Sequence, residues 1–306
     1  MLAIVLALAA AIGYGGSDFA AGLATRSGSV VPVTLIVSVG SALIVAAALP
    51  FAAAPGPSAA ALAWGFGAGL GGTLGAFALY LGFRYAAFSV AAPLSAVGSA
   101  GFSVLAGLLL GERPTDLALA GIALALPAIV AVSASAAAAS DTPVQEEAAQ
   151  KEAAQEEAVQ GEAATDRPAA GVLLGLVAGA CFALLFIGLD QAGSGSGLWP
   201  VAAATAGELA ASLVAVLVTR SIRLPGTRPR LLAALAGATG SAGTILFFLA
   251  THKGFLAVTA VLTSLYPAMT ILLARVLLGE RLTALRLGGL VMAGACVALI
   301  ALGGAS

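Results

Sequence analysis

Two acidic residues of this 306-residue chain interrupt long apolar stretches. Glu208 falls near the middle of the apolar run 198–219, and Asp18 lies past the middle of the apolar run 2–24. In a lipid bilayer a carboxylate needs a proton or a cationic partner to offset its desolvation, and residues that carry this cost usually have a function. Glu208 and Asp18 are therefore our candidates for binding a proton or a positively charged group of a ligand. The alternatives are a structural hydrogen bond for Glu208 and a water-facing position for Asp18.

Aromatic residues and prolines could complete a pocket around these acids. Pro93 and Pro267 lie inside apolar runs, where a missing backbone hydrogen bond can kink a helix or expose carbonyl groups to a cavity. We predict that four aromatic side chains line the pocket, with ordinary packing as the alternative for each: Tyr14, Tyr80, Phe182 and Tyr266.

The other acids outside the segment 141–167 occur where apolar runs begin or end, and we interpret them as structural: Glu112, Asp116, Asp190 and Glu280. Glu112 follows Gly111, which suits a helix C-terminus, and precedes Thr115, which suits the N-cap of the next helix. The acid and the neighbouring Arg113 are expected to hold a short turn together. Cations near the ends of apolar runs, Arg84 and the pair His252–Lys253, are expected to reach the membrane interface.

Other chemistry finds little support in the sequence. His252 is the single histidine, so a multi-histidine metal site is excluded. Cys181 and Cys296 both lie in apolar runs, where we interpret them as small buried side chains. There is no phosphate-binding loop and no Ser/His/Asp arrangement with supporting spacing. We therefore expect no catalytic residue, no metal and no cofactor, and we do not expect an enzyme.

The composition shows where these residues must be held. Apolar residues make up 60% of the chain and charged residues 9%, against roughly a quarter charged in soluble domains. A bilayer can use this much apolar surface, and about 20 apolar residues span its hydrocarbon core as a helix. The runs are continuously apolar and do not alternate, which favours helices over a barrel. We predict an all-α integral membrane protein with ten transmembrane helices, at 2–24, 31–53, 60–83, 90–110, 116–135, 171–189, 198–219, 231–250, 256–278 and 284–303.

The predicted helices fall into two sets of five. The sequence LLGERPT at 109–115 returns as LLGERLT at 277–283, an offset of 168 residues. Because five is an odd number, the second set must enter the membrane from the opposite side, which makes an inverted repeat. Such repeats commonly build transporters that bind their substrate near the midplane. The predicted domains are a first five-helix repeat at 1–135, an acidic linker rich in Ala, Glu and Gln at 136–168, and a second five-helix repeat at 169–306.

The distribution of positive charge bears on orientation. If the N-terminus is outside the cell, eight arginines lie in cytoplasmic loops, whereas the opposite arrangement leaves only Arg113 and Lys253 there. The positive-inside rule therefore favours external termini. The linker is expected to be a solvated spacer between the repeats.

Three motifs together resemble the EamA-type transporters of the drug/metabolite transporter superfamily. Gly-Ser-Asp-Phe at 16–19 resembles the Trp-Gly-Ser-Asn-Phe stretch of that family, with Asp in place of Asn. The repeated Leu-Leu-Gly-Glu-Arg closes the fourth helix of each half, and Pro267 precedes Glu280 at the family's spacing. The first half departs from this pattern, because Ser99 stands where the second half has Pro267. The resemblance covers 2–135 and 171–303. It implies a ten-helix secondary carrier with a central cavity lined by both halves, and it implies cytoplasmic termini, contrary to the charge distribution.

We therefore expect a multi-pass protein of the plasma (inner) membrane that exports or exchanges small organic metabolites or drugs by alternating access. Its partners would be a small-molecule solute, protons if transport is proton-coupled, and the lipid bilayer, but no nucleic acid. It would act as a monomer or a homodimer. Two acids without a deep base suggest a cationic or zwitterionic solute, or proton exchange. The alternatives are a membrane enzyme acting on lipid-linked substrates and a non-transporting membrane scaffold.

Overall fold

The computed structural model describes residues 1–25, 29–51, 56–82, 88–138, 168–220, 224–278 and 284–303. Within these residues every regular element is a helix, as predicted. The linker repeats, Arg84 and the second Gly-Glu-Arg turn with Glu280 lie outside the described residues. The first half contains α1 (Leu2–Thr25), α2 (Val30–Ala48), the short 3-10 helix η1 (Leu49–Phe51), α3 (Ala59–Gly82), α4 (Phe88–Leu109) and α5 (Asp116–Ala138).

The second half contains α7 (Pro168–Gln191), α8 (Trp199–Thr219), α9 (Thr227–Thr251), α10 (Leu256–Thr263), α11 (Tyr266–Leu278) and α12 (Ala284–Gly303). Of the described helices, six are long and apolar enough to cross a membrane, and four further apolar stretches are shorter. The protein is therefore a multi-pass membrane protein, and the crossing number of ten stays a prediction.

One predicted helix is wrong. The segment 256–278 was expected to be continuous, but it divides into α10 and α11 at Ser264 and Leu265. The N–H of Ser264 still donates to the Ala260 oxygen at 2.8 Å, whereas the N–H of Leu265 turns to the Leu262 oxygen at 3.3 Å. Pro267 explains the break, because it has no N–H to continue the ladder and its ring opposes the helical carbonyl four residues earlier.

The helices of each half pack mainly against helices of the other half. The most extensive helix contacts all join one half to the other: α1 with α9, α5 with α12, α3 with α7, α4 with α7, α3 with α8, and α2 with both α8 and α9. Helices in lipid gain nothing from the hydrophobic effect when they associate. Small residues that let the backbones approach closely therefore stabilise the contacts between helices by van der Waals packing.

Two close contacts between the halves are related by the repeat offset of 168 residues. A Cβ added to Gly13 would lie 2.9 Å from the Thr239 oxygen, and one added to Gly71 would lie 2.9 Å from the Cys181 oxygen. Position 181 is equivalent to position 13 in the repeat, and position 239 is equivalent to position 71. The contact of Gly13 with Thr239 and the contact of Gly71 with Cys181 therefore join the same two repeat positions, with the halves exchanged. This reciprocity is what two copies of one module related by a two-fold axis would produce.

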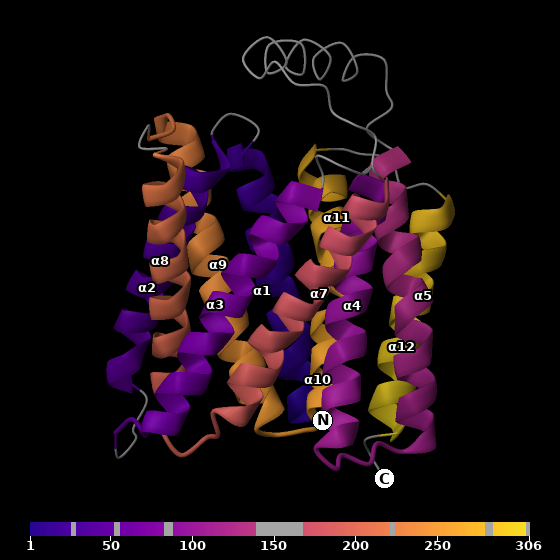
Figure 1. Ribbon diagram of the computed structural model, residues 1–306. Helices are drawn as coiled ribbons and strands as arrows, with labels where there is room; N and C mark the ends of the chain where they lie inside the picture. Colours follow the sequence, from indigo (N-terminus) through magenta and orange to yellow (C-terminus); the bar gives the residue numbers. More distant parts are fainter. Residues whose placement is uncertain are drawn as a thin grey trace.

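The bundle has two distinct ends. We call one the terminus-side end, because α1 begins and α12 ends there (Figure 1). α5 also begins at this end, where the Thr115 hydroxyl donates to the Gly303 carbonyl oxygen at 3.0 Å. The opposite, linker-side end is where α5 ends and α7 begins.

Candidate functional site

A cavity of about 230 Å³ lies between the two halves. Eight helices line it, namely α1, α2, α3 and α4 from the first half and α7, α8, α9 and α11 from the second. Its wall includes five of the six residues that the sequence analysis predicts to lie there: Tyr14, Asp18, Phe182, Glu208 and Tyr266. Tyr80 belongs to α3, but its side chain lies outside the described part of the structure.

The cavity extends from mid-bundle toward the linker-side end. On α2, which begins at that end, the lining residues run from Val33 to Ser41. On α3, which ends there, they run from Gly69 to Leu79. On α1 they run from Tyr14 to Thr25, the last residue of the helix. On these helices the described lining residues stop short of the terminus-side end.

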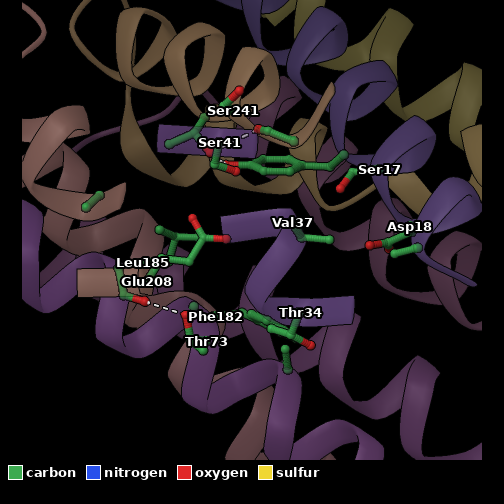
Figure 2. A pocket seen from close by; sticks show the side chains of 18 of the residues that line it. Ser17, Asp18, Thr34, Val37, Ser41, Thr73, Phe182, Leu185, Glu208 and Ser241 are labelled. Carbon is green, nitrogen blue, oxygen red and sulfur yellow. Dashed lines mark hydrogen bonds between the residues drawn. The ribbon is translucent and has the colours of Figure 1, made fainter. Parts of the chain in front are cut away.

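The two acids approach the cavity from different halves and opposite sides (Figure 2). Asp18 projects from α1, and its side chain is exposed. Glu208 projects from α8 and is half-buried. Ser38 of α2 is a hydrogen-bonding neighbour of Glu208. The Ser38 hydroxyl in turn lies 2.8 Å from the hydroxyl of Ser212, and both serines are buried. Glu208 therefore lies where α2 and α8 pack together.

Tyr14 stands within electrostatic range of both carboxyl groups. Its hydroxyl donates to the Thr244 hydroxyl oxygen at 3.1 Å, and Thr244 donates to the Gly240 carbonyl at 3.1 Å. This chain ties α1 of the first half to α9 of the second. The ring of Tyr14 lies 6.4 Å from that of Phe186, which packs at 4.5 Å on Phe247. Of these rings, Tyr14 and Phe186 line the cavity, and Phe247 packs behind Phe186 in the core.

The break between α10 and α11 lies beside the cavity wall. Tyr266, the first residue of α11, lines the cavity. Ser99 of α4 lines it as well, and its hydroxyl oxygen lies 3.4 Å from that of Ser264. The position of Tyr266 follows from Pro267, because the helix restarts there.

Sequence reasoning missed the hydroxyl side chains of the site. Serine and threonine residues from six helices line the cavity beside the predicted acids and aromatics. No motif distinguishes them from the many other Ser and Thr residues of the chain, because small hydroxyl residues are equally useful for packing helices. Asp18 and Glu208 are the only Asp, Glu, Lys, Arg or His residues lining the cavity in the described part of the chain.

The first Gly-Glu-Arg turn is a structural element outside the cavity. Gly111 adopts φ +95°, and Thr115 caps α5 by accepting from the Ala118 N–H at 3.3 Å, both as predicted. The Glu112 carboxylate accepts from the backbone N–H groups of Leu256 and Ala257, the latter at 2.9 Å. It therefore caps the N-terminus of α10 across the two halves.

The expected pairing of Glu112 with its neighbouring arginine is not what holds the turn. Arg113 donates to the Glu112 backbone oxygen at 3.3 Å. Burial raises the pKa of the Glu112 carboxyl above its usual range. The two N–H donors at the start of α10 and the positive end of the α10 helix dipole lower this pKa, but by less than burial raises it.

Asp190 and the pair His252–Lys253 also lie near the terminus-side end (Figure 1). Asp190 is half-buried at the end of α7 and accepts from the Gln191 amide at 2.9 Å. The Nδ1 of His252 lies 2.6 Å from the Phe248 carbonyl oxygen, and Lys253 is exposed. Within the described residues, no cluster of three His, Cys, Asp or Glu side chains is placed to hold a metal ion.

Comparisons with known proteins found a shared fold over most of the chain and a family match over its second half. A solved structure described only as a protein crystal structure superposes with a TM-score of 0.71, covering 96% of this chain and 98% of its own at 16% identity, which shows a shared fold. No curated protein matches this sequence. Residues 169–302 match the EamA-like transporter family.

Proposed function

We propose that this protein, whose second half is an EamA-like transporter domain, is a secondary transporter of small organic metabolites or drugs that works by alternating access. The family match indicates a membrane transporter of the drug/metabolite superfamily. The observation that carries the finer proposal is the cavity, which draws its lining from both halves and reaches from mid-bundle toward one end only. A transporter that exposes its site to one side at a time requires this arrangement.

The conformation described here would be open at the linker-side end and closed at the terminus-side end. Closure involves contacts between the halves, including the Glu112 cap on α10 and the bond from Thr115 to Gly303. Transport requires a second conformation in which such contacts separate and equivalent contacts form at the linker-side end. The reciprocal packing of Gly13 with Thr239 and of Gly71 with Cys181 supports this, because related modules can exchange equivalent arrangements.

Asp18 and Glu208 would provide the coupling between solute and protons. Each lies on the cavity wall, and no basic side chain of the described residues shares that wall. A carboxylate in such a place is neutralised either by a proton or by a cationic solute. If the proton and the solute compete for the same carboxylates, they bind alternately, and the transporter exchanges solute for protons across the membrane.

The test is flux through purified protein in liposomes with an imposed pH gradient. Asp18→Asn and Glu208→Gln keep the size of each side chain and remove its charge, whereas Asp116→Asn does the same at an exposed helix start outside the cavity. We expect either cavity variant to lose most proton-driven flux and the control to retain it. Unchanged flux and an unchanged pH profile in both cavity variants would remove the proposed roles.

A further inference from the structure

We propose that the cavity selects protonated amines and rejects the corresponding amino acids. This inference rests on the proposed transport function and narrows its substrate to a chemical class, organic cations that donate N–H hydrogen bonds and carry no carboxylate. Three features of the cavity wall lead to it: its formal charges, the direction of its hydroxyl hydrogen bonds, and the hydrogen bonding at the start of α11.

The formal charges on the wall have one sign. Asp18 and Glu208 face the cavity from opposite sides (Figure 2), and no Lys, Arg or His of the described residues lines it. Described cations such as Arg113, Lys253 and Arg228 lie in turns or at helix starts at the two ends of the bundle. A solute ammonium group would therefore meet one or two carboxylates, whereas a solute carboxylate would meet like charge.

The hydroxyl groups of the wall are oriented to accept hydrogen bonds. Among the described residues, eight of the nine Ser and Thr hydroxyls that line the cavity donate their hydrogen to a backbone carbonyl. Thr73 donates to its own helix at the Gly69 oxygen (3.1 Å), and Ser41 donates across to α9 at the Gly237 oxygen (3.2 Å). A hydroxyl has one hydrogen and two lone pairs, so these groups are left with acceptor capacity only.

The Tyr14 hydroxyl follows the same rule, because its hydrogen goes to Thr244. A wall of acceptors with few free donors favours a ligand that supplies donors, and an ammonium group supplies up to three. An amino acid carboxylate is an acceptor only, and on this wall it would lose its water without gaining partners.

A helix N-terminus could in principle bind a solute carboxylate with its free N–H groups. α11 begins at the cavity with Tyr266, but its first turn has few donors to offer. Pro267 has no N–H, the N–H of Leu265 is used by Leu262, and the N–H of Ala268 is used by Leu265 at 2.9 Å. The α11 N-terminus therefore does not compensate for the missing cations.

The size and the apolar side of the cavity set the rest of the ligand. A volume of about 230 Å³ is below the roughly 300–1,000 Å³ typical of sites for drug-sized ligands. Tyr14, Phe182, Phe186 and Tyr266 contribute aromatic surface beside the two acids. Aromatic faces accept both apolar groups and cations, so a small amine with an apolar or aromatic body matches the site.

The experiment compares solutes that differ only by an α-carboxylate. Purified full-length protein in liposomes is assayed by counterflow with phenethylamine against phenylalanine, and with agmatine against arginine. We expect the amine of at least one pair to move at least tenfold faster than its amino acid. Glu208→Gln and Asp18→Asn should reduce this preference, and Asp116→Asn should leave it unchanged.

The outcomes separate the substrate class from the transport function. Equal flux of amine and amino acid in both pairs, or faster flux of the amino acid, would overturn the amine preference and leave transport standing. The same holds if only solutes without an amine move in a wider panel of neutral and anionic metabolites. If no solute in either panel gives flux or thermal stabilisation of the purified protein, both the preference and the transport proposal are contradicted.

Discussion

Replacing Gly69 with alanine should separate two helices that form the cavity wall. Gly69 lies in α3 and faces the backbone of Ala204 in α8. A Cβ on Gly69 would lie 2.7 Å from the Ala204 carbonyl carbon and 2.9 Å from its Cα, well inside the roughly 3.5–4.0 Å at which such atoms rest. The obstacle is helical backbone and cannot turn away. We therefore expect Gly69→Ala to destabilise the protein by about 1–3 kcal/mol, the usual cost of overpacking.

Gly67 provides a matched control on the same helix. It is exposed, and a Cβ there would meet nothing within 4 Å. Gly67→Ala adds the same methyl group without a clash and replaces a poor helix former, so it should stabilise α3 by roughly 0.5–1 kcal/mol. The two variants, which are identical in composition, should thus differ by about 1.5–4 kcal/mol.

The assay is unfolding of both variants in mixed micelles with increasing SDS, followed by circular dichroism and tryptophan fluorescence. Flux in liposomes serves as the functional readout, and we expect it to fall for Gly69→Ala because Gly69 and Ala204 both line the cavity. If Gly69→Ala unfolds at the same SDS fraction as Gly67→Ala, or at a higher one, α3 and α8 do not pack as closely as described.

Three further predictions follow from the ends of the bundle. Glu112→Ala removes the cap of α10 and should lower the free energy of unfolding by about 1 kcal/mol, whereas the exposed Arg113→Ala should change it little; equal effects in the SDS assay would contradict the cap. The pKa of Glu112 is raised by burial in the folded protein, so its ionisation opposes folding. The contribution of the protonated Glu112 carboxyl to stability should be complete below the pKa of Glu112 in the unfolded chain and lost as pH rises through its pKa in the folded protein. Glu112→Gln should remove this pH dependence from the SDS unfolding midpoint; the same dependence of the midpoint on pH in both proteins would refute the prediction. In a chain without native cysteines, Lys253→Cys should react with an impermeant thiol reagent on intact cells and Thr227→Cys should not, because the positive-inside rule places the linker-side end in the cytoplasm; the reverse labelling would support cytoplasmic termini.

The sequence led to the correct class of fold for simple reasons. A bilayer requires long apolar helices, and composition reports their presence directly. It also identified Asp18 and Glu208 as cavity residues, since an acid inside an apolar run rarely faces lipid. Tyr14 and Tyr266 were found by the weaker argument that aromatics near such acids line pockets.

The partners of these residues could not be found in the same way. Ser38 reaches Glu208 from a different half of the chain, and Thr244 meets Tyr14 across 230 positions of sequence. Helix rotation and depth decide such meetings, and continuously apolar helices have no amphipathic stripe from which rotation can be read. The role of Glu112 was missed for a related reason, because the N-terminus it caps belongs to the other half.

By itself the sequence determined that the chain is a helical membrane protein, and which two acids break its apolar runs. Those properties depend on composition and local order, which a bilayer makes decisive. Only the tertiary structure decided that the helices of the two halves pack together, that both acids face one cavity, and that this cavity extends toward one end. It also decided that most hydroxyl groups on the cavity wall donate their hydrogen to backbone carbonyls. Each of these depends on how helices approach one another, and that approach is set by contacts between residues far apart in the chain.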